Sequence, residues 1–506
     1  MNTTPTDPVA DPVADPVAEP VAEPPAAPRS RALSSADRKL VLDVYLDGHA
    51  SVVGRLVHTG TETTFAYDAA YAAARPRAPL SLSLPVGNHV YGPREALPYF
   101  ENLMPEGRRL NAVALQLGLD RRDVMSILEH VGRDCAGAVS IVPGGEQPSK
   151  TPGEFPGDYE EIAPADLLKQ METGIAETRP KGKGHPFSLA GVQGKAAVLM
   201  GSDGRFYQPT GGAPSTHVVK LPDAGHAGMI ENEAFCLELA RVMGLDAVEP
   251  KVVTLPGDRP AIVVPRFDRE VERHHHGDVE PSAEDGADFA LPSADGISGP
   301  ATVRRLHQED FAQALGYTSD RKYTKYGGPS FEQLLVLDKV DAVARYRLSL
   351  LDALIFNILI GNADAHAKNY SLLHGRDFRT RLAPLYDLLS IALYPDFHQG
   401  MALTLGAEDG KIEQEFDELD RAALERAGVR LKMRASLIEG RMRSAASKIL
   451  PAAHRLREEK GYGVTALKVI SAIGVQVRLL NEKFGFDVKV NEIEFQPKGG
   501  GWLTPS

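Results

Sequence analysis

Three polar side chains in the C-terminal half of the chain have the types and the spacing needed for phosphoryl transfer. Asp364 is followed five residues later by Asn369, and eighteen residues after that by Asp387. A carboxylate can accept the proton of an attacking hydroxyl, while an amide oxygen and a second carboxylate can hold the magnesium ions that neutralise phosphates. Protein kinases use this spacing in the catalytic loop and the metal-binding aspartate. The three residues therefore predict a phosphate-transfer site with Asp364 as the base.

Asp364 is expected on a loop at the floor of a cleft, because it follows Gly361 at the end of an apolar, buried-looking helix. His366 and Lys368 lie inside this loop and would supply positively charged donors for phosphate oxygens. A simpler interpretation is a helix N-terminus at which Asp364 and Asn369 serve as caps. That interpretation requires all three separations to arise by coincidence, so we favour the phosphate-transfer site.

A lysine and an acidic helix further upstream could complete such a site. Lys220 ends an apolar strand, from which a lysine can reach the α- and β-phosphates of a nucleotide. The helix that follows carries Glu231 and Glu233, and we favour Glu233 slightly as the partner of the lysine. Both signals also have a simpler explanation, because strands often end in a solvated lysine and acids suit the first turn of a helix.

The segment 188–195 (SLAGVQGK) has the composition of a phosphate-contacting loop. Its small residues permit close approach of a backbone to phosphate, and Lys195 adds positive charge. The segment matches neither the Walker A pattern nor the G-x-G-x-x-G pattern. A hairpin turn explains it equally well.

Length and composition bound the class of protein. With 506 residues, 43% hydrophobic and 25% charged, the chain is expected to be soluble and globular with two or three domains. No apolar run approaches the ~20 residues that span a bilayer, and the N-terminus lacks the pattern of a signal peptide. Two cysteines, Cys135 and Cys236, favour small core residues in a reducing cytoplasm over a disulfide scaffold.

The negative charge is concentrated in two segments. Of the formal net charge of −12, most lies in the N-terminal tail and in residues 270–302. The tail repeats Asp/Glu-Pro-Val-Ala, and such proline density predicts a disordered extended segment. Residues 270–302 are expected to form a long insertion loop, in which three adjacent histidines, 274–276, could bind metal only if flanking structure fixed them. This acidic balance gives no support to autonomous nucleic-acid binding.

The remaining patterns predict a β-rich part followed by a helical part, with the chemistry where they join. The expected organisation is a tail at 1–36, a β-rich unit at 37–145, a strand-rich region at 146–303 and a helical region at 304–500. Strands are expected at 40–46, 51–57, 65–67, 80–85, 136–142, 188–200, 215–221 and 261–267. Helices are expected at 96–102, 108–117, 121–131, 164–177, 230–243, 308–315, 331–343, 346–361, 416–427, 432–455 and 464–484.

In their order along the chain, these motifs resemble those of the HipA toxin kinase family, the serine/threonine kinases of bacterial toxin–antitoxin pairs. The resemblance runs from about Lys39 to Lys498. It implies an α+β, bilobal protein-kinase-like fold with a β-rich N-terminal subdomain and a helical C-terminal lobe. Ten blocks carry it: 78–85, 100–107, 132–138, 188–195, 216–222, 231–233, 266–269, 305–316, 361–369 and 384–390.

The resemblance implies a role for each matching residue. Asp364 would be the catalytic base, Asn369 and Asp387 would hold Mg²⁺, and Lys220 would hold the phosphates of ATP. Ser188 matches a serine whose autophosphorylation ejects the loop and silences kinases of this family. Glu233 would pair with the lysine, and the other nucleotide-binding positions would be Ala190, Gly191, Val192, Gln193, Gly194 and Lys195 in the loop, Arg266 and Phe267 at the adenine-side hinge, and His366, Lys368 and Tyr386.

The same resemblance implies partners and a target. The partner would be a small DNA-binding antitoxin of the HipB type, through which alone the protein would contact DNA, and the target would be an aminoacyl-tRNA synthetase. Two positions depart from the family pattern, because Gly194 replaces an acid in the loop and Pro265 replaces an acid before the hinge. These departures keep open a catalytically weak scaffold that acts with the antitoxin in transcriptional autoregulation. A small-molecule phosphotransferase is a third hypothesis, which the family-like N-terminal part disfavours.

Overall fold

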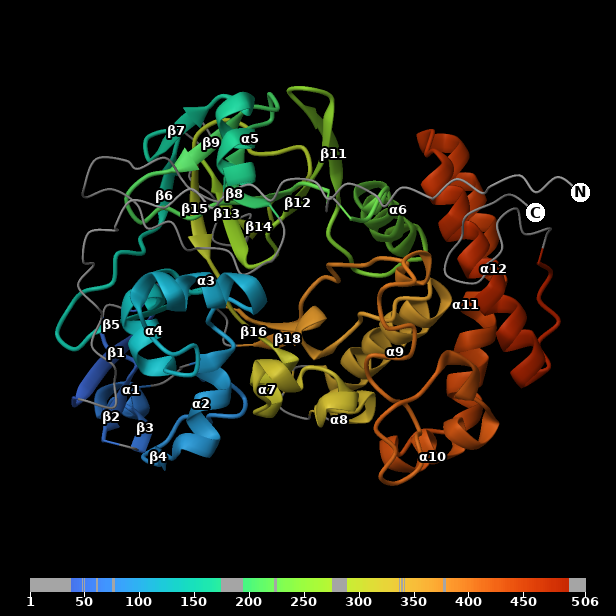
Figure 1. Cartoon of the computed structure of the whole chain (residues 1–506), viewed down its shortest axis with the longest axis horizontal. Helices are drawn as coiled ribbons and strands as arrows, with labels where there is room; N and C mark the ends of the chain where they lie inside the picture. Colours follow the sequence, from blue (N-terminus) through green and yellow to red (C-terminus); the bar gives the residue numbers. More distant parts are fainter. Residues whose placement is uncertain are drawn as a thin grey trace, which may run out of the picture.

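The computed structural model describes most of the chain between residues 38 and 490 (Figure 1). The predicted tail lies outside the described residues, as do His275, His276 and positions 188–193 of the predicted phosphate loop. Cys135 and Cys236 are buried and free, which confirms their prediction as core residues. The positions not described are 1–37, 48, 50, 61, 75–77, 174–193, 223–224, 275–288, 336, 338–339, 341, 376–378 and 491–506.

The N-terminal subdomain, residues 38–143, is built on a five-stranded antiparallel sheet with the order β4-β3-β2-β1-β5. The predicted strand at 40–46 is confirmed, and the next strand begins three residues later than expected. The prediction of a strand at 80–85 is wrong, since only an isolated bridge between Ser81 and Leu84 forms there. The strands are β1 (Leu40–Leu46), β2 (Gly54–Thr59), β3 (Glu62–Tyr67), β4 (Val90–Tyr91) and β5 (Val139–Pro143).

Helices pack against this sheet and bury large aromatic side chains. Phe65, Tyr99 and Phe100 are fully buried between the sheet and α2. Three of the helices lie where the apolar periodicity places them. The helices are α1 (Ala69–Ala73), α2 (Pro93–Glu101), α3 (Gly107–Leu117) and α4 (Val124–Val131).

Residues between 159 and 265 form a six-stranded antiparallel sheet with the order β11-β12-β10-β8-β9-β7. β10 lies between β12 and β8, so that Lys220 is level with Ile262 on one side and Lys195 on the other. α6 packs on this sheet, and ten of its side chains are buried. The elements are α5 (Pro164–Thr173), α6 (Met229–Val242), β7 (Tyr159–Ile162), β8 (Lys195–Met200), β9 (Phe206–Pro209), β10 (His217–Lys220), β11 (Lys251–Leu255) and β12 (Arg259–Pro265).

The prediction that residues 270–302 form only a loop is wrong at both ends. β13 and β15 pair with each other there and complete a four-stranded sheet of order β14-β13-β15-β6. Apolar side chains of these strands, including Val271 and Val303, pack against the six-stranded sheet. The strands are β6 (Gly153–Phe155), β13 (Arg269–Arg273), β14 (Phe289–Ala290) and β15 (Ala301–Arg305).

A three-stranded sheet with the order β16-β17-β18 joins the lobes and was not expected. The helix predicted at 308–315 divides there, because residues 307–310 pair with β17 before Asp310 caps a short helix. The elements are β16 (His307–Asp310), α7 (Phe311–Leu315), β17 (Ser371–His374) and β18 (Thr380–Leu382). In Figure 1, α7 lies beside the blue N-terminal subdomain, and its contacts with α2 confirm that proximity.

Helices dominate the C-terminal lobe, as predicted. α9 is the central helix, and it is buried on most of its faces, as expected of a helix that is apolar all round. The helix predicted at 331–343 is shorter, since α8 ends at Leu335. The helices are α8 (Phe331–Leu335), α9 (Val343–Leu359), α10 (Arg421–Leu431), α11 (Ala435–Lys460) and α12 (Val464–Phe484).

α12 is long and apolar enough, by length and composition, to cross a membrane, and within the described part of the chain no other helix meets both criteria. No such segment was predicted from the sequence. Half of its most apolar window is buried in the protein, where α12 packs against α6, α9 and α11. Such burial is typical of the core helix of a folded domain.

Candidate active site

Lys220 lies between two carboxylates that come from different parts of the chain. At the end of β10, its Nζ donates to Glu233 Oε1 at 2.5 Å and to Asp387 Oδ1 at 3.0 Å. Glu233 lies on α6, where the sequence left two acids as alternatives. The other acid, Glu231, accepts a hydrogen bond from Gly463 N at 2.6 Å and so holds the start of α12.

These ion pairs set the charge of the groups involved. Burial opposes charge on Lys220, but Glu233 and Asp387 raise its pKa above the usual range. Lys220 in turn holds the pKa of Asp387 well below its usual range. A protonated lysine and an ionised aspartate are the states that can bind phosphate and a metal cation, respectively.

The two residues before Asp387 hold its backbone in place. Leu385 N donates to Asp246 O at 2.8 Å, which joins this segment to the turn after α6. Tyr386 stacks on Phe267 with ring centroids 4.9 Å apart. Asp387 itself has φ 56°, a left-handed conformation that aspartate adopts more readily than most residues. Together these contacts direct the Asp387 carboxylate to Lys220.

The turn after α9 positions Asp364. Gly361 has φ 63°, and a Cβ there would lie 2.9 Å from the Cβ of Ala392, so the turn requires glycine. Asn362 Nδ2 donates to Asn357 Oδ1 at 2.8 Å inside the end of the helix. Asn362 Oδ1 then accepts from Asp364 N at 3.1 Å. Buried amides therefore fix the backbone on which the predicted base stands.

The Asp364 carboxylate and its carbonyl oxygen have separate partners. Tyr323 donates its hydroxyl proton to Asp364 Oδ1, and Asn369 Nδ2 donates to Asp364 O at 2.8 Å. Burial raises the pKa of Asp364 to about 6, the hydrogen bond from Tyr323 opposes that shift, and Asp387 adds to it. A carboxylate with this pKa is ionised near neutral pH and is a stronger base than an ordinary aspartate.

Lys368 bonds to three groups that belong to other segments. Its Nζ lies 3.1 Å from Glu106 Oε1, 3.0 Å from Asp310 Oδ2 and 2.7 Å from Asn102 Oδ1. These contacts occupy the three donors of the ammonium group. The sequence suggested a phosphate donor, whereas in this structure Lys368 joins the segment around Asp364 to the N-terminal subdomain.

His366 is buried beside Tyr323, with ring centroids 4.9 Å apart. Burial lowers the pKa of His366 to about 3, and Lys322 contributes to the shift. The ring is therefore neutral, which differs from the charged donor that the sequence suggested. Its Nδ1 has no hydrogen-bond partner within the described residues.

The predicted hinge is held by an ion pair. Arg266 contacts Asp268 through Nε and Nη2 at 3.2 and 3.1 Å and donates from Nη1 to Ser215 Oγ at 3.1 Å. Arg266 N donates to Thr216 O at 2.8 Å, directly after Pro265 ends β12. Arg266 thus fixes the segment that follows β12. The nucleotide-binding role of Arg266 and Phe267 stays a prediction.

Only the end of the predicted phosphate loop lies within the described residues. Gly194 O accepts from Leu221 N at 2.9 Å, and Lys195 begins β8 beside Lys220. Burial lowers the pKa of Lys195, and the positive charge of Lys220 contributes. Ser188, Ala190, Gly191, Val192 and Gln193 are outside the described residues.

The donor set fits a magnesium ion bound together with phosphates. Across the described residues, no three His, Cys, Asp or Glu side chains converge as in a preformed metal centre. Magnesium is usually held by one or two protein oxygens, with phosphate and water supplying the rest. Asn369 uses its amide nitrogen on Asp364, which leaves the side-chain oxygen for a cation, and Asp387 is ionised.

Two residues that contact the site, Tyr323 and Glu106, were not predicted from the sequence. Tyr323, which contacts the base, gave no signal beyond its position in a basic and aromatic stretch. Glu106, which pairs with Lys368 and also with Lys322 at 2.8 Å, lies in the family-like block 100–107. The sequence showed only that this block resembles the family, and it gave no role to Glu106 in the phosphate-transfer site.

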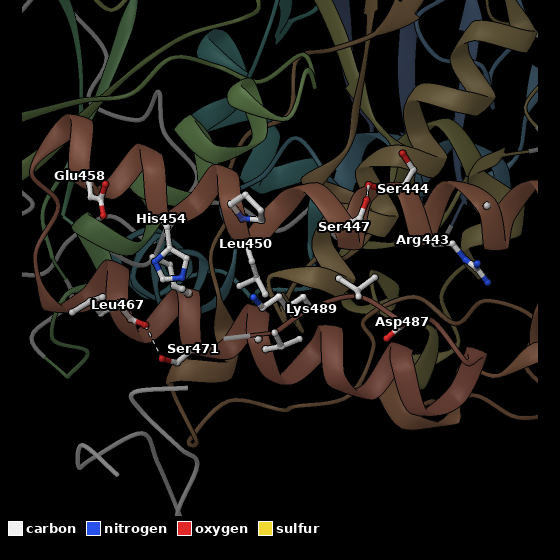
Figure 2. Close-up of a pocket in the computed structure, with 16 residues that line it drawn as sticks. Arg443, Ser444, Ser447, Leu450, His454, Glu458, Leu467, Ser471, Asp487 and Lys489 are labelled. Atoms are coloured by element: carbon white, nitrogen blue, oxygen red, sulfur yellow. Dashed lines mark hydrogen bonds between the residues drawn. The ribbon is translucent and has the colours of Figure 1, made fainter. Parts of the chain in front are cut away.

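A separate groove lies between α11, α12 and residues 487–490 (Figure 2). Its volume is about 910 Å³, and Figure 2 shows His454 of α11 and Ser471 of α12 lining it together with Lys489. None of its lining residues belongs to the constellation around Lys220 and Asp364.

Comparison with known proteins agrees with this geometry. A family model described as the HipA-like C-terminal domain matches residues 187–452, and one described as the HipA N-terminal domain matches residues 42–142. The chain belongs to the HipA family. A Sinorhizobium fredii relative named "Putative kinase Y4mE" is 36% identical over 404 residues, which cover 78% of this chain and 87% of that protein.

Two further comparisons, both with HipA of Shewanella oneidensis, support the assignment. The serine/threonine-protein kinase toxin HipA of Shewanella oneidensis is 28% identical over 400 residues, which cover 76% of this chain and 81% of the relative. A solved structure of HipA from the same species, with HipB and operator DNA, superposes with a TM-score of 0.66 at 23% identity. That match covers 89% of this chain and all of the HipA chain, and it establishes the protein-kinase-like fold.

Proposed function

We propose that this protein is a toxin kinase that transfers the γ-phosphate of ATP to a serine or threonine hydroxyl of a target protein. The observation that carries the proposal is the bridge of Lys220 between Glu233 and Asp387, beside a buried Asp364. A lysine–glutamate pair next to a metal-binding aspartate is the arrangement that protein kinases need for transfer. Relatives named as kinases support the same reading.

In the proposed mechanism each residue has one task. When bound, ATP would supply the phosphoryl group, and Mg²⁺ held by Asn369 and Asp387 would neutralise its charge. Lys220 would bind the α- and β-phosphates. Asp364 orients the acceptor hydroxyl and takes its proton, while Tyr323 holds one carboxylate oxygen in place.

A relative supports the proposed partner, while the proposed regulation and target rest on the resemblance of the sequence motifs to the family. The Shewanella HipA structure is a complex with HipB and operator DNA, and we propose a HipB-type antitoxin as the partner of this chain, with DNA contacted only through it. We propose that phosphorylation of Ser188 switches the kinase off. An aminoacyl-tRNA synthetase is the proposed target, and its modification would inhibit translation and growth.

Expression in bacterial cells tests the toxin function. Cells that produce the wild-type chain should stop growing and gain one or a few phosphoserine or phosphothreonine sites that are absent from cells producing Asp364→Ala. Phosphoproteomics would identify the target. If both variants arrest growth equally and no site depends on Asp364, the protein is no kinase toxin.

The departures at Gly194 and Pro265 favour one second candidate. A catalytically weak kinase fold could act with the antitoxin in transcriptional autoregulation. In that case Asp364→Ala and wild type would repress the operon promoter equally, and neither would label protein with phosphate.

A further inference from the structure

The N-terminal subdomain contributes a charged side chain to the edge of the kinase site. Glu106, at the start of α3, receives two ammonium groups from the C-terminal lobe. Its Oε2 lies 2.8 Å from Lys322 Nζ, and its Oε1 lies 3.1 Å from Lys368 Nζ. The Glu106 side chain is 25% exposed.

The two lysines adjoin the residues that meet at the predicted base. Lys322 precedes Tyr323, whose hydroxyl donates to Asp364. Lys368 precedes Asn369, which holds the carbonyl oxygen of Asp364. One carboxylate therefore ties together the two segments that approach Asp364 from opposite sides in sequence.

Further hydrogen bonds join the same two parts of the chain. Asn102 Nδ2 donates to Tyr317 O at 2.8 Å, and its Oδ1 accepts from Lys368. Ser319 donates to Glu101 Oε1 at 3.1 Å. The end of α2 thus docks on the stretch that leads to Tyr323.

Glu106 is unsuited to a direct catalytic role. Although burial opposes ionisation, Lys368 and Lys322 lower its pKa to about 2, so that it stays charged and cannot accept a proton near neutral pH. Both of its oxygens are occupied by lysines. Its contribution to the site is the placement of other groups.

We infer that Glu106 is a positioning residue of the kinase site, through which the N-terminal subdomain fixes Tyr323 and the catalytic loop around Asp364. Loss of the Glu106 charge should affect Lys322 more than Lys368. Lys368 keeps Asp310 as a second carboxylate partner, whereas among the described residues Glu106 is the one carboxylate within 4 Å of Lys322. Loss of a charged partner from such a site leaves the remaining charge poorly compensated. The inference rests on the proposed kinase activity.

The test is Glu106→Gln in the full-length chain, which keeps the size of the side chain and removes its charge. We expect kcat to fall by about tenfold to a hundredfold, as for small misplacements of catalytic groups, with KM for ATP changed less than about twofold. Glu129→Gln is the matched control, since Glu129 pairs with Arg38 within the N-terminal subdomain. It should leave both constants unchanged.

A double-mutant cycle separates positioning from a general loss of stability. If Glu106 acts through Lys322, the kcat effects of Glu106→Gln and Lys322→Met should overlap rather than add. Unchanged kcat in a folded Glu106→Gln protein overturns the inference. If that variant does not fold, Asn102→Ala and Lys322→Met replace it, and unchanged kcat in both has the same meaning. An inactive wild type would instead refute the proposed function itself.

Discussion

Tyr323 donates a hydrogen bond to Oδ1 of Asp364, although 41 residues separate the two in sequence. The bond occupies one oxygen of the predicted base, and the proposed mechanism assigns the other oxygen to an acceptor hydroxyl. Because the phenol also contacts the ring of His366, its position is fixed from two sides.

Removal of the Tyr323 hydroxyl should weaken catalysis without unfolding the protein. In Tyr323→Phe the ring contacts remain, but the Asp364 carboxylate loses the bond that orients it. We expect kcat to fall by about tenfold while KM for ATP stays near its wild-type value. Steady-state kinetics with the identified target measure both constants, and a rise in kcat would show instead that the tyrosine blocks the acceptor.

The rate should fall on the acid side of pH 6. Burial raises the pKa of Asp364 to about 6, and a general base works only when ionised, so the active fraction decreases about tenfold for each pH unit below that value. The pH profile of kcat measures this limb. A rate that stays constant down to about pH 4, where an ordinary aspartate titrates, would contradict the role of Asp364.

Replacement of Lys220 should impair both activity and stability. Lys220→Met removes the cation that compensates two carboxylates, one of them buried, so we expect the free energy of unfolding to fall by about 3 kcal/mol. Loss of the phosphate contact should lower kcat/KM by about a hundredfold or more. Lys251→Met, on β11 of the same sheet, should match wild type in urea unfolding and in turnover. Wild-type activity in Lys220→Met would exclude a phosphate role.

Autophosphorylation should depend on Ser188. Incubation of the purified protein with ATP should place the principal phosphate on this serine, and Ser188→Ala should lose that phosphate while retaining transfer to the target. Intact-mass and peptide mass spectrometry decide the point. A principal phosphate at another residue in the wild type would defeat the proposed switch.

The periodicity of apolar residues predicted correctly those helices and strands that bury at least one face along their whole length. The bounds of α12 match the prediction, and the strand at 40–46 does as well. The helix expected at 308–315 failed because residues 307–310 pair with β17, some sixty residues away in sequence. Pairing with a distant strand outweighs the helical periodicity of the segment itself, and it cannot be predicted from the neighbouring residues alone.

In the candidate site, too, some residues could be predicted from the sequence and others could not. Asp364, Asn369 and Asp387 were predicted from their spacing, because protein kinases place a base and two metal ligands at these separations. Tyr323 was not predicted because its contact with Asp364 joins two positions of the C-terminal lobe that are 41 apart in sequence. Glu106 was not predicted because its contact with Lys322 forms only when the N-terminal subdomain docks on that lobe. Charge states also required the structure, as the neutral ring of His366 follows from its burial.

Transfer of radiolabelled phosphate from ATP by the purified chain tests the central claim most directly. Wild-type protein with Mg²⁺ should label itself or a synthetase substrate, while Asp364→Ala, Asp387→Ala and wild type with excess EDTA should not. Equal labelling by wild type and Asp364→Ala, or none by dephosphorylated wild type with Mg²⁺ and candidate substrates, would contradict the assignment of this site as a kinase.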